Sequence, residues 1–386
     1  MNIAFIHTIF PGGGAERISR DIAMSINAGF PSKYNFFIFA QIIIEEALTE
    51  EYNTPFKSID TYPIGKSETR AIESLVKKHS IDAIVLISRR IHDIKGFRKR
   101  CGCKVVFANH GEPFHLRYEL ALNRRNNRFK DLMWKLYRRK LYEDWGYALY
   151  KAKRSCIKDY ENCDKYVVLC SEYKDIICKE LGLAPGKDHI SVINNPEREV
   201  SDVCYDKQDI ILFSGRLEQF SKRVDRLLRI WGKVMDDLPE WRLLIAGEGA
   251  DGELLRRMAR EMGLKRIEFI GYQKDMTQLY RKASILCLTS QTEGWGLCLT
   301  EAQANGVIPI AFGCTGGIRE ILSPDGVNGF IIKPFDEDNY AAVLKDIAKM
   351  DEKERMALRH NAVNHVKKFS LSETAKKWDS LFSSII

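Results

Sequence analysis

Residues 283–302 read ASILCLTSQTEGWGLCLTEA, a segment that combines a strand, a glycine-flanked loop and a helix. The apolar run at residues 285–288 is typical of a buried strand, and the helix is expected to begin near Gly296. Glu293 lies in the loop, and Glu301 lies inside the helix, about 7.5 Å along its axis at about 1.5 Å per residue. A carboxylate in so apolar a helix is costly to bury without hydrogen-bond donors, which ribose hydroxyls would supply. A capping role for the pair is the simpler alternative.

The same strand-then-helix unit recurs through the C-terminal half of the chain. Short β-branched runs alternate there with segments of helical period. The runs are residues 210–213, 243–246, 267–270, 285–288, 308–311 and 330–332. Between the first two runs, one helix face carries Val224, Leu227, Leu228, Trp231 and Val234. This alternation predicts an α/β domain with a parallel sheet.

The N-terminal half opens in the same way. A strand at residues 3–7 is followed by a glycine loop at 11–14 and by a helix with Ile18, Ile22 and Ile26 on one face. Further strands are expected at residues 36–40, 83–87, 105–108 and 166–170, and one or two long, basic helices at 116–160. The turn Asn194-Asn195-Pro196 and the polar run through Gln208 form the best linker. We therefore divide the chain into domains 1–205 and 206–365 and a C-terminal helix, 366–386, whose apolar face needs a partner.

Composition excludes several classes of protein. The 386 residues suffice for two domains, and 45% apolar with 29% charged residues is typical of a globular chain. No stretch approaches the ~20 consecutive apolar residues of a membrane-spanning helix. Residues 1–7 lack a basic leader and a cleavage site, so we interpret them as a first strand rather than a signal peptide. Ten cysteines without regular spacing indicate buried thiols in a reducing compartment, so we expect a cytoplasmic protein without a zinc site.

The positive charge of the chain is local. The formal net charge is +8, and residues 88–160 alone hold 20 Lys and Arg against 7 Asp and Glu. The aromatic residues interleaved with these cations are Trp134, Tyr137, Tyr142, Trp145 and Tyr150. A solvated helix face or a nucleic-acid site would also carry such a run, but Trp and Tyr beside cations are typical of proteins at an anionic membrane surface. We expect a peripheral protein on the inner membrane face that binds no nucleic acid.

A group of cations follows the strand at residues 210–213. The strand ends in Ser214-Gly215-Arg216, and Lys222 and Arg223 open the next helix. Cations are disfavoured at a helix N-terminus unless an anion is present, and a diphosphate suits a guanidinium fork beside an ammonium group. The alternative is a solvated helix start.

Two glycine motifs could approach a ligand through their backbone. The loop Gly12-Gly13-Gly14 lets amide groups face an anion at a helix N-terminus, and a tight turn is the alternative. The second motif, residues 247–252, satisfies Gly-x-Gly-x-x-Gly, which suggests a dinucleotide site. The next strand, however, ends in Gly271-Tyr272 with no acidic residue for a ribose, so we favour a structural turn.

Together these motifs resemble the retaining, nucleotide-sugar-dependent glycosyltransferases of group 1, or family four, which have the GT-B fold. Glu293 and Glu301 match the Glu-x7-Glu signature of that family, and Gly215-Arg216-Leu217 with Lys222 is similar to its phosphate-binding pair. The resemblance covers nearly all of residues 210–335 and the first 25, and it fades between about 40 and 200. It implies two Rossmann-like parallel-sheet domains facing a central cleft, with the C-terminal helix packing back on the N-terminal domain.

The resemblance also implies roles for single residues. The N-terminal domain would bind the acceptor and the C-terminal domain the donor, with Glu301 on the ribose, Arg216 and Lys222 on the diphosphate and Glu293 on the sugar. Further substrate-binding residues would be Gly13 and Gly14, whose loop would close over the phosphates, and Gly215, Gly271, Tyr272, Gly294, Trp295, Gly296 and Leu297. The gap after Arg216 is one residue longer than usual, so either Lys222 or Arg223 would contact the phosphate. His110 matches a family histidine near the reacting sugar, with a buried core histidine as the alternative.

These features predict retaining transfer of a hexosyl group from a nucleoside-diphosphate sugar to a saccharide or lipid-linked saccharide, in surface polysaccharide or lipopolysaccharide synthesis. Fixed cations and amides would stabilise the leaving diphosphate. No cofactor or metal ion is expected, because the acidic cluster at residues 336–338 lies at a helix start and is interpreted as a cap. The alternatives are a sugar-nucleotide epimerase of the same fold and an NAD-binding protein.

Overall fold

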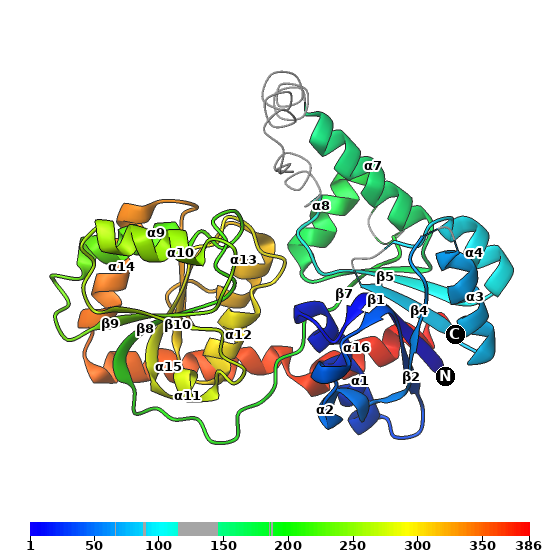
Figure 1. Cartoon of the computed structure of the whole chain (residues 1–386), viewed down its shortest axis with the longest axis horizontal. Helices are drawn as coiled ribbons and strands as arrows, with labels where there is room; N and C mark the ends of the chain where they lie inside the picture. Colours follow the sequence, from blue (N-terminus) through cyan, green and yellow to red (C-terminus); the bar gives the residue numbers. More distant parts are fainter. Residues whose placement is uncertain (66, 88–89, 115–145, 185, 187) are drawn as a thin grey trace. The chain divides into compact units, whose positions relative to one another are not determined.

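The computed structural model describes residues 1–65, 67–87, 90–114, 146–184, 186 and 188–386 (Figure 1). The chain forms two compact units: unit 1 is Met1–Asn194 with Thr374–Ile386, and unit 2 is Asn195–Glu373. The boundary falls within the expected turn at 194–196 rather than near residue 205. The reason is that the polar run after the turn packs on unit 2, where Glu197 Oε2 accepts a hydrogen bond from Thr300 at 2.6 Å and the Tyr205 carbonyl accepts one from Arg359 at 3.2 Å.

Unit 1 is built on a seven-stranded parallel sheet in the order β3-β2-β1-β4-β5-β6-β7. The strands are β1 (Asn2–Phe10), β2 (Asn35–Ile43), β3 (Phe56–Thr61), β4 (Ala83–Ile87), β5 (Lys104–Asn109), β6 (Lys165–Val168) and β7 (Ile190–Val192). The helical segments are α1 (Gly14–Gly29), η1 (Glu45–Ala47), α2 (Glu50–Asn53), α3 (Glu68–Lys78), α4 (Ile94–Cys101), α7 (Tyr147–Glu161), α8 (Ser171–Leu181) and α16 (Leu371–Ser383). The five strands expected in this half are all present.

Two strands of unit 1 do not follow from the sequence pattern. β3 (FKSIDT) mixes polar and apolar residues, and β7 has only three residues. Both lie at an edge of the sheet, where one side of the strand has no neighbouring strand and an apolar run is not required. The central strand β4, in contrast, is buried along its whole length and gives the continuous apolar run typical of a parallel sheet.

The last helix, α16, packs on unit 1 through its apolar face. Trp378 and Phe382 are buried, and the Phe382 ring lies 5.8 Å from that of Tyr34. The Tyr34 hydroxyl donates a hydrogen bond to Asp379 at 2.7 Å, and Lys33 pairs with the same carboxylate at 2.5 Å. The apolar face that carries Trp378, Leu381 and Phe382 is therefore buried in unit 1, and its Phe382 packs on the segment before β2.

Unit 2 is built on a six-stranded parallel sheet in the order β10-β9-β8-β11-β12-β13. The strands are β8 (Gln208–Ser214), β9 (Arg242–Ala246), β10 (Ile267–Gly271), β11 (Ala283–Leu288), β12 (Ile308–Phe312) and β13 (Phe330–Ile332). The helical segments are α9 (Val224–Val234), α10 (Gly252–Glu261), α11 (Thr277–Lys282), α12 (Leu297–Ala304), α13 (Gly316–Leu322), α14 (Glu337–Lys349), α15 (Glu352–Val366) and η4 (Lys367–Phe369). All six expected strands are present, and the predicted α/β class with two parallel-sheet domains is confirmed.

Each sheet has one point where the strand order reverses. In unit 2 the chain runs outward from β8 through β9 to β10, then returns to place β11 on the other side of β8. In unit 1 the same reversal separates β1 from β4. Ligands of open α/β sheets bind outside the carboxyl ends of the strands at such a point, because the two flanking loops leave in opposite directions.

Candidate functional site

The candidate site of unit 2 lies where β8 and β11 end. The β8 strand leads into Gly215 and Arg216, and the β11 strand leads into the loop that carries Glu293. The two loops are joined by the amide of Gln291, which donates to the Ser221 carbonyl at 2.7 Å. Residues that the sequence places 70 positions apart therefore meet at the topological reversal of the sheet.

Lys222 and Glu293 form the centre of this site. Lys222 Nζ lies 2.5 Å from Glu293 Oε1, which also accepts a hydrogen bond from the Ser290 hydroxyl at 2.6 Å. Both partners are largely buried. Burial alone would lower the pKa of Lys222, but the adjacent Glu293 carboxylate outweighs it, and the pKa is raised above its usual value. The site thus holds an ammonium group in the loop between β8 and α9.

Arg223 points to a different partner. It precedes α9 in a left-handed conformation (φ 48°), and its guanidinium binds Asp225 through Nε at 2.9 Å and Nη2 at 2.8 Å. Lys222, in contrast, passes close to Gly215, whose added Cβ would lie 3.6 Å from Lys222 Cε. Of the two cations left open by the sequence, the structure brings Lys222 to Glu293.

Arg216 is the most exposed cation of the site. Its side chain is 72% exposed and pairs with Glu218 at 3.0 Å. Surface pairs of this kind contribute about 0–1 kcal/mol, so an incoming anion can replace Glu218 at little cost. The positive charge of Arg216 also acts on the pKa of Lys222, which places the two cations in one electrostatic neighbourhood.

Glu301 lies on the next element, the helix α12. The helix begins at Leu297, after Gly296 in a left-handed conformation (φ 99°) that favours glycine. Glu301 Oε2 accepts a hydrogen bond from the hydroxyl of Tyr280 on α11 at 2.7 Å. The sequence pattern does not identify Tyr280. Its contact with Glu301 joins the helix that precedes β11 in the chain to the helix that follows it, and no local pattern shows such a contact.

The buried thiol of Cys298 lies within the electrostatic reach of these charged groups. Burial raises the pKa of Cys298 to about 12, and the charges of Lys222, Glu293 and Glu301 all act on it. Both glutamates of the Glu-x7-Glu pair therefore lie in the neighbourhood of Cys298, and a ligand that contacts both stays a prediction.

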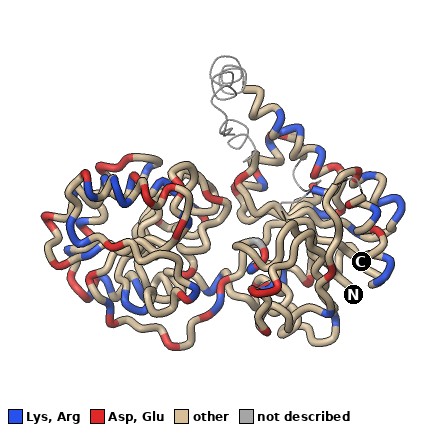
Figure 2. Tube along the Cα trace, viewed as in Figure 1, with Lys and Arg blue, Asp and Glu red and all other residues tan. Residues whose placement is uncertain are grey.

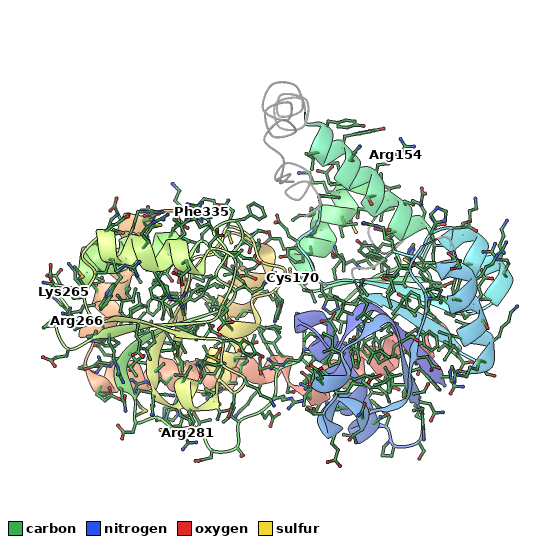
Figure 3. The ribbon with its side chains drawn as sticks, viewed as in Figure 1. Arg154, Cys170, Lys265, Arg266, Arg281 and Phe335 are labelled. Carbon is green, nitrogen blue, oxygen red and sulfur yellow. The ribbon has the colours of Figure 1, made fainter. Side chains whose placement is uncertain are left out.

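Arg226 and Gly317 contact the loop that carries Glu293. Arg226 is buried, donates to Gln291 Oε1 at 2.5 Å, and stacks on Phe335 with its guanidinium carbon 4.0 Å from the ring centroid. Phe335, the residue on which Arg226 stacks, can be located in Figure 3. A Cβ on Gly317 would lie 2.6 Å from the Gly294 carbonyl oxygen, so only glycine fits against the loop there. Trp295 is 3% exposed and packs edge-on against Phe369, so its ring belongs to the core of unit 2.

The Gly-x-Gly-x-x-Gly motif has a packing role. A Cβ on Gly247 would lie 1.9 Å from the Gly215 carbonyl oxygen, and one on Gly249 would lie 2.5 Å from that of Leu217. Without side chains, these glycines let the loop after β9 lie directly against the loop after β8. This close contact supports the interpretation of the motif as a structural turn. At the end of the neighbouring β10, Gly271 adopts φ 71° and Tyr272 is 71% exposed.

The remaining predicted site residues belong to unit 1. Gly13 and Gly14 follow β1, at the reversal point of that sheet, and the Gly13 amide donates to Glu16 Oε2 at 2.6 Å. Although burial opposes it, hydrogen bonds from His7 and Gly13 lower the pKa of Glu16. His110 is half-buried and follows β5, at the same carboxyl edge of the sheet.

Comparison with known proteins identifies the family of this site. Residues 196–365 match the family model described as "Glycosyl transferases group 1". Unit 2 is a group 1 glycosyltransferase domain. The resemblance inferred from the Glu-x7-Glu pair and its neighbours is thereby confirmed, and the matched residues cover nearly all of unit 2.

Relatives with curated descriptions extend the match beyond the glycosyltransferase domain. An uncharacterized glycosyltransferase of Haemophilus influenzae is 24% identical over 361 residues, which are 89% of this chain and 88% of that protein. The chain spans about half the length of the D-inositol 3-phosphate glycosyltransferases of several Corynebacterium species that it also matches.

Solved structures share the fold of both units. The lipopolysaccharide outer core galactosyltransferase WaaB, in its apo form, gives a TM-score of 0.69 at 21% identity, with both chains covered completely. HepE of Anabaena, in complex with UDP-glucose, gives a TM-score of 0.73 at 15% identity, again over both whole chains. At these identities the likeness concerns the fold, and the predicted GT-B class is confirmed.

Two features are absent from the described residues. Within the ranges given above, no helix is long and apolar enough to cross a membrane. Over the same ranges, no cluster of three or more His, Cys, Asp or Glu side chains is placed to hold a metal ion.

Proposed function

We propose that this glycosyltransferase moves a hexosyl group from a nucleoside-diphosphate sugar to a saccharide acceptor with retention of the anomeric configuration. The observation that carries the proposal is the meeting of Lys222, Glu293 and Glu301 at the reversal point of the unit 2 sheet. This is the place where an open α/β sheet binds a nucleotide. The complex of HepE with UDP-glucose makes a UDP-sugar the first donor to test.

The chemistry proposed for the site is stabilisation of the leaving diphosphate. Negative charge grows on the β-phosphate as the bond to the sugar breaks, and fixed cations stabilise it because they need no reorganisation. Lys222 is a buried ammonium held in place by Glu293, and Arg216 is an exposed guanidinium that can close on the second phosphate. Glu293 would accept hydrogen bonds from the sugar hydroxyls and Glu301 from the ribose. Neither step requires a metal ion or a cofactor.

A product analysis tests this proposal. The chain is incubated with UDP-glucose, UDP-galactose and their GDP and ADP counterparts, each with and without an oligosaccharide acceptor panel that includes lipopolysaccharide core sugars. We expect nucleoside diphosphate release that depends on acceptor and a product whose anomeric proton has the α coupling of the donor. A β-linked product would contradict retention. Conversion of the donor sugar to an isomer without acceptor would show an epimerase.

We further propose that the acceptor is lipid-anchored and that the enzyme works on the inner leaflet, in surface polysaccharide or lipopolysaccharide synthesis. WaaB, which shares the fold, is a lipopolysaccharide galactosyltransferase. Of the basic window, residues 115–145 with Trp134, Tyr137, Tyr142 and Trp145 lie outside the described residues. The α7 helix is described, and Figure 2 shows Lys and Arg along it. Tyr150 is 55% exposed, and Arg154 is an exposed residue of the same helix (Figure 3). Lys158 is also exposed and lies four residues later, so the two cations share one face of α7.

Vesicle flotation tests this surface. At low salt we expect the chain to float with vesicles that contain anionic lipid and to be released as salt rises, because each Lys or Arg near such a surface contributes about 1 kcal/mol. Replacing Arg154 and Lys158 by Glu should lower binding roughly tenfold or more. The control variant, Arg257→Glu with Lys265→Glu, makes the same charge change on exposed residues of unit 2 and should bind like wild type. Equal losses in both variants would mean that only net charge matters.

A further inference from the structure

The Glu301 carboxylate is held by a hydrogen bond from a buried tyrosine of α11. Tyr280 is buried at 3% exposure, and its hydroxyl donates to Glu301 Oε2 at 2.7 Å. Ser214, the last residue of β8, lies close enough to act on the pKa of the same hydroxyl. Tyr280 therefore bonds to the carboxylate on α12 and lies near the end of the strand that leads to Arg216.

Lys207 fixes the two helices that carry this contact. Its Nζ donates to the Tyr280 carbonyl at 2.8 Å and to the Asn305 carbonyl at 2.8 Å. Asn305 caps the C-terminus of α12, and its side-chain amide donates in turn to the Glu301 carbonyl at 2.9 Å. Lys207 thus links the backbone of Tyr280, the hydroxyl donor, to the C-terminus of α12, the helix that carries Glu301.

We propose that Tyr280 is a positioning residue for nucleotide binding: it holds the Glu301 carboxylate in the orientation that receives the vicinal hydroxyls of a ribose. The proposal rests on the proposed function, in which Glu301 contacts the ribose. A carboxylate accepts about four hydrogen bonds, so the bond from Tyr280 is compatible with two more from a diol. Charge-assisted hydrogen bonds are short and directional, and a carboxylate that is oriented before binding loses less freedom when the ligand arrives.

The state of the tyrosine agrees with this role. Burial raises the pKa of Tyr280 well above its usual value, and the adjacent Glu301 charge adds to the shift. The hydroxyl therefore keeps its proton over the working pH range and remains a donor to the carboxylate.

The experiment compares nucleotides with and without the ribose hydroxyls. Dissociation constants are measured by calorimetry for UDP, GDP and ADP and for their 2′,3′-dideoxy forms, with wild type and Tyr280→Phe. We expect Tyr280→Phe to weaken binding of the preferred ribonucleotide about tenfold and to leave binding of its dideoxy form within about twofold. Loss of affinity by the same factor for both forms would show a merely structural role and would overturn the proposal.

The control variant is Tyr340→Phe. Tyr340 is a second buried tyrosine of unit 2, and its hydroxyl donates to the Ile310 carbonyl at 2.7 Å, so this change also removes one buried hydrogen bond. Its affinities should match those of wild type, and melting temperatures show whether both variants are folded. If wild type itself does not prefer the ribonucleotide, the ribose assignment of Glu301 fails first. If wild type prefers it and Tyr280→Phe behaves identically, only the inference about Tyr280 fails.

Discussion

Replacing Lys222 by alanine is expected to lower kcat about 10²–10³-fold, whereas replacing Arg223 by alanine should leave it within about threefold. A preorganised charge aimed at a developing anion contributes on that scale to turnover. Lys222 Nζ lies in the centre of the site beside Glu293, whereas the Arg223 guanidinium is taken up by Asp225. The measurement is steady-state release of nucleoside diphosphate at saturating donor.

Two further variants make this result interpretable. Lys222→Met keeps the apolar stem and shows whether the loss comes from the charge rather than from a cavity. Arg216→Ala should also lower activity strongly, and the double variant should be little worse than either single one, because both cations act on the same diphosphate. A normal Lys222→Ala enzyme beside an inactive Arg223→Ala enzyme would mean that ligand binding exchanges the two cations.

Whether Lys222 or Arg223 faces Glu293 could not be predicted from the sequence. Both sheets could be predicted because buried parallel strands require continuous apolar runs, as in β4 and β11. The direction of a side chain in the loop after β8 follows no periodicity. It depends on the left-handed backbone at Arg223 and on Asp225, which accepts both guanidinium bonds.

Tyr280 marks a second limit of the same kind. Its helix, α11, is only six residues long, and a tyrosine there looks like an ordinary core residue. Its partner Glu301 lies on α12, beyond the whole of β11, so the contact appears only when the two helices are packed. The sequence does indicate the packing role of the glycines at 247 and 249, because no acidic residue at the end of β10 is placed to bind a ribose, and their close backbone contacts agree with that role.

The two glutamates are expected to separate binding from turnover. Glu301→Ala should weaken binding of the preferred nucleoside diphosphate at least tenfold, since hydrogen bonds to a charged group contribute about 1.5–3 kcal/mol each. Glu293→Ala should lower kcat by a similar factor while nucleotide affinity is retained or rises. The reason for the rise is that Glu293 occupies Lys222 before the ligand binds, at 2.5 Å, and competes with the diphosphate for that ammonium group.

Calorimetry with the nucleoside diphosphate and initial rates with the sugar donor measure these two effects on the same samples. Glu293→Gln serves as the second variant, because it removes the charge and keeps the shape of the side chain. In Glu293→Ala, the carboxylate that raises the pKa of Lys222 is gone, so burial should lower this pKa. Any gain in nucleotide affinity should then be lost as the pH rises through the lowered pKa of Lys222, because the neutral amine no longer attracts the diphosphate. A Glu293 variant that loses nucleotide affinity at every pH would place this carboxylate on the nucleotide and not on the sugar. If Glu301→Ala bound the nucleoside diphosphate as tightly as wild type, the proposed contact between Glu301 and the ribose would be wrong.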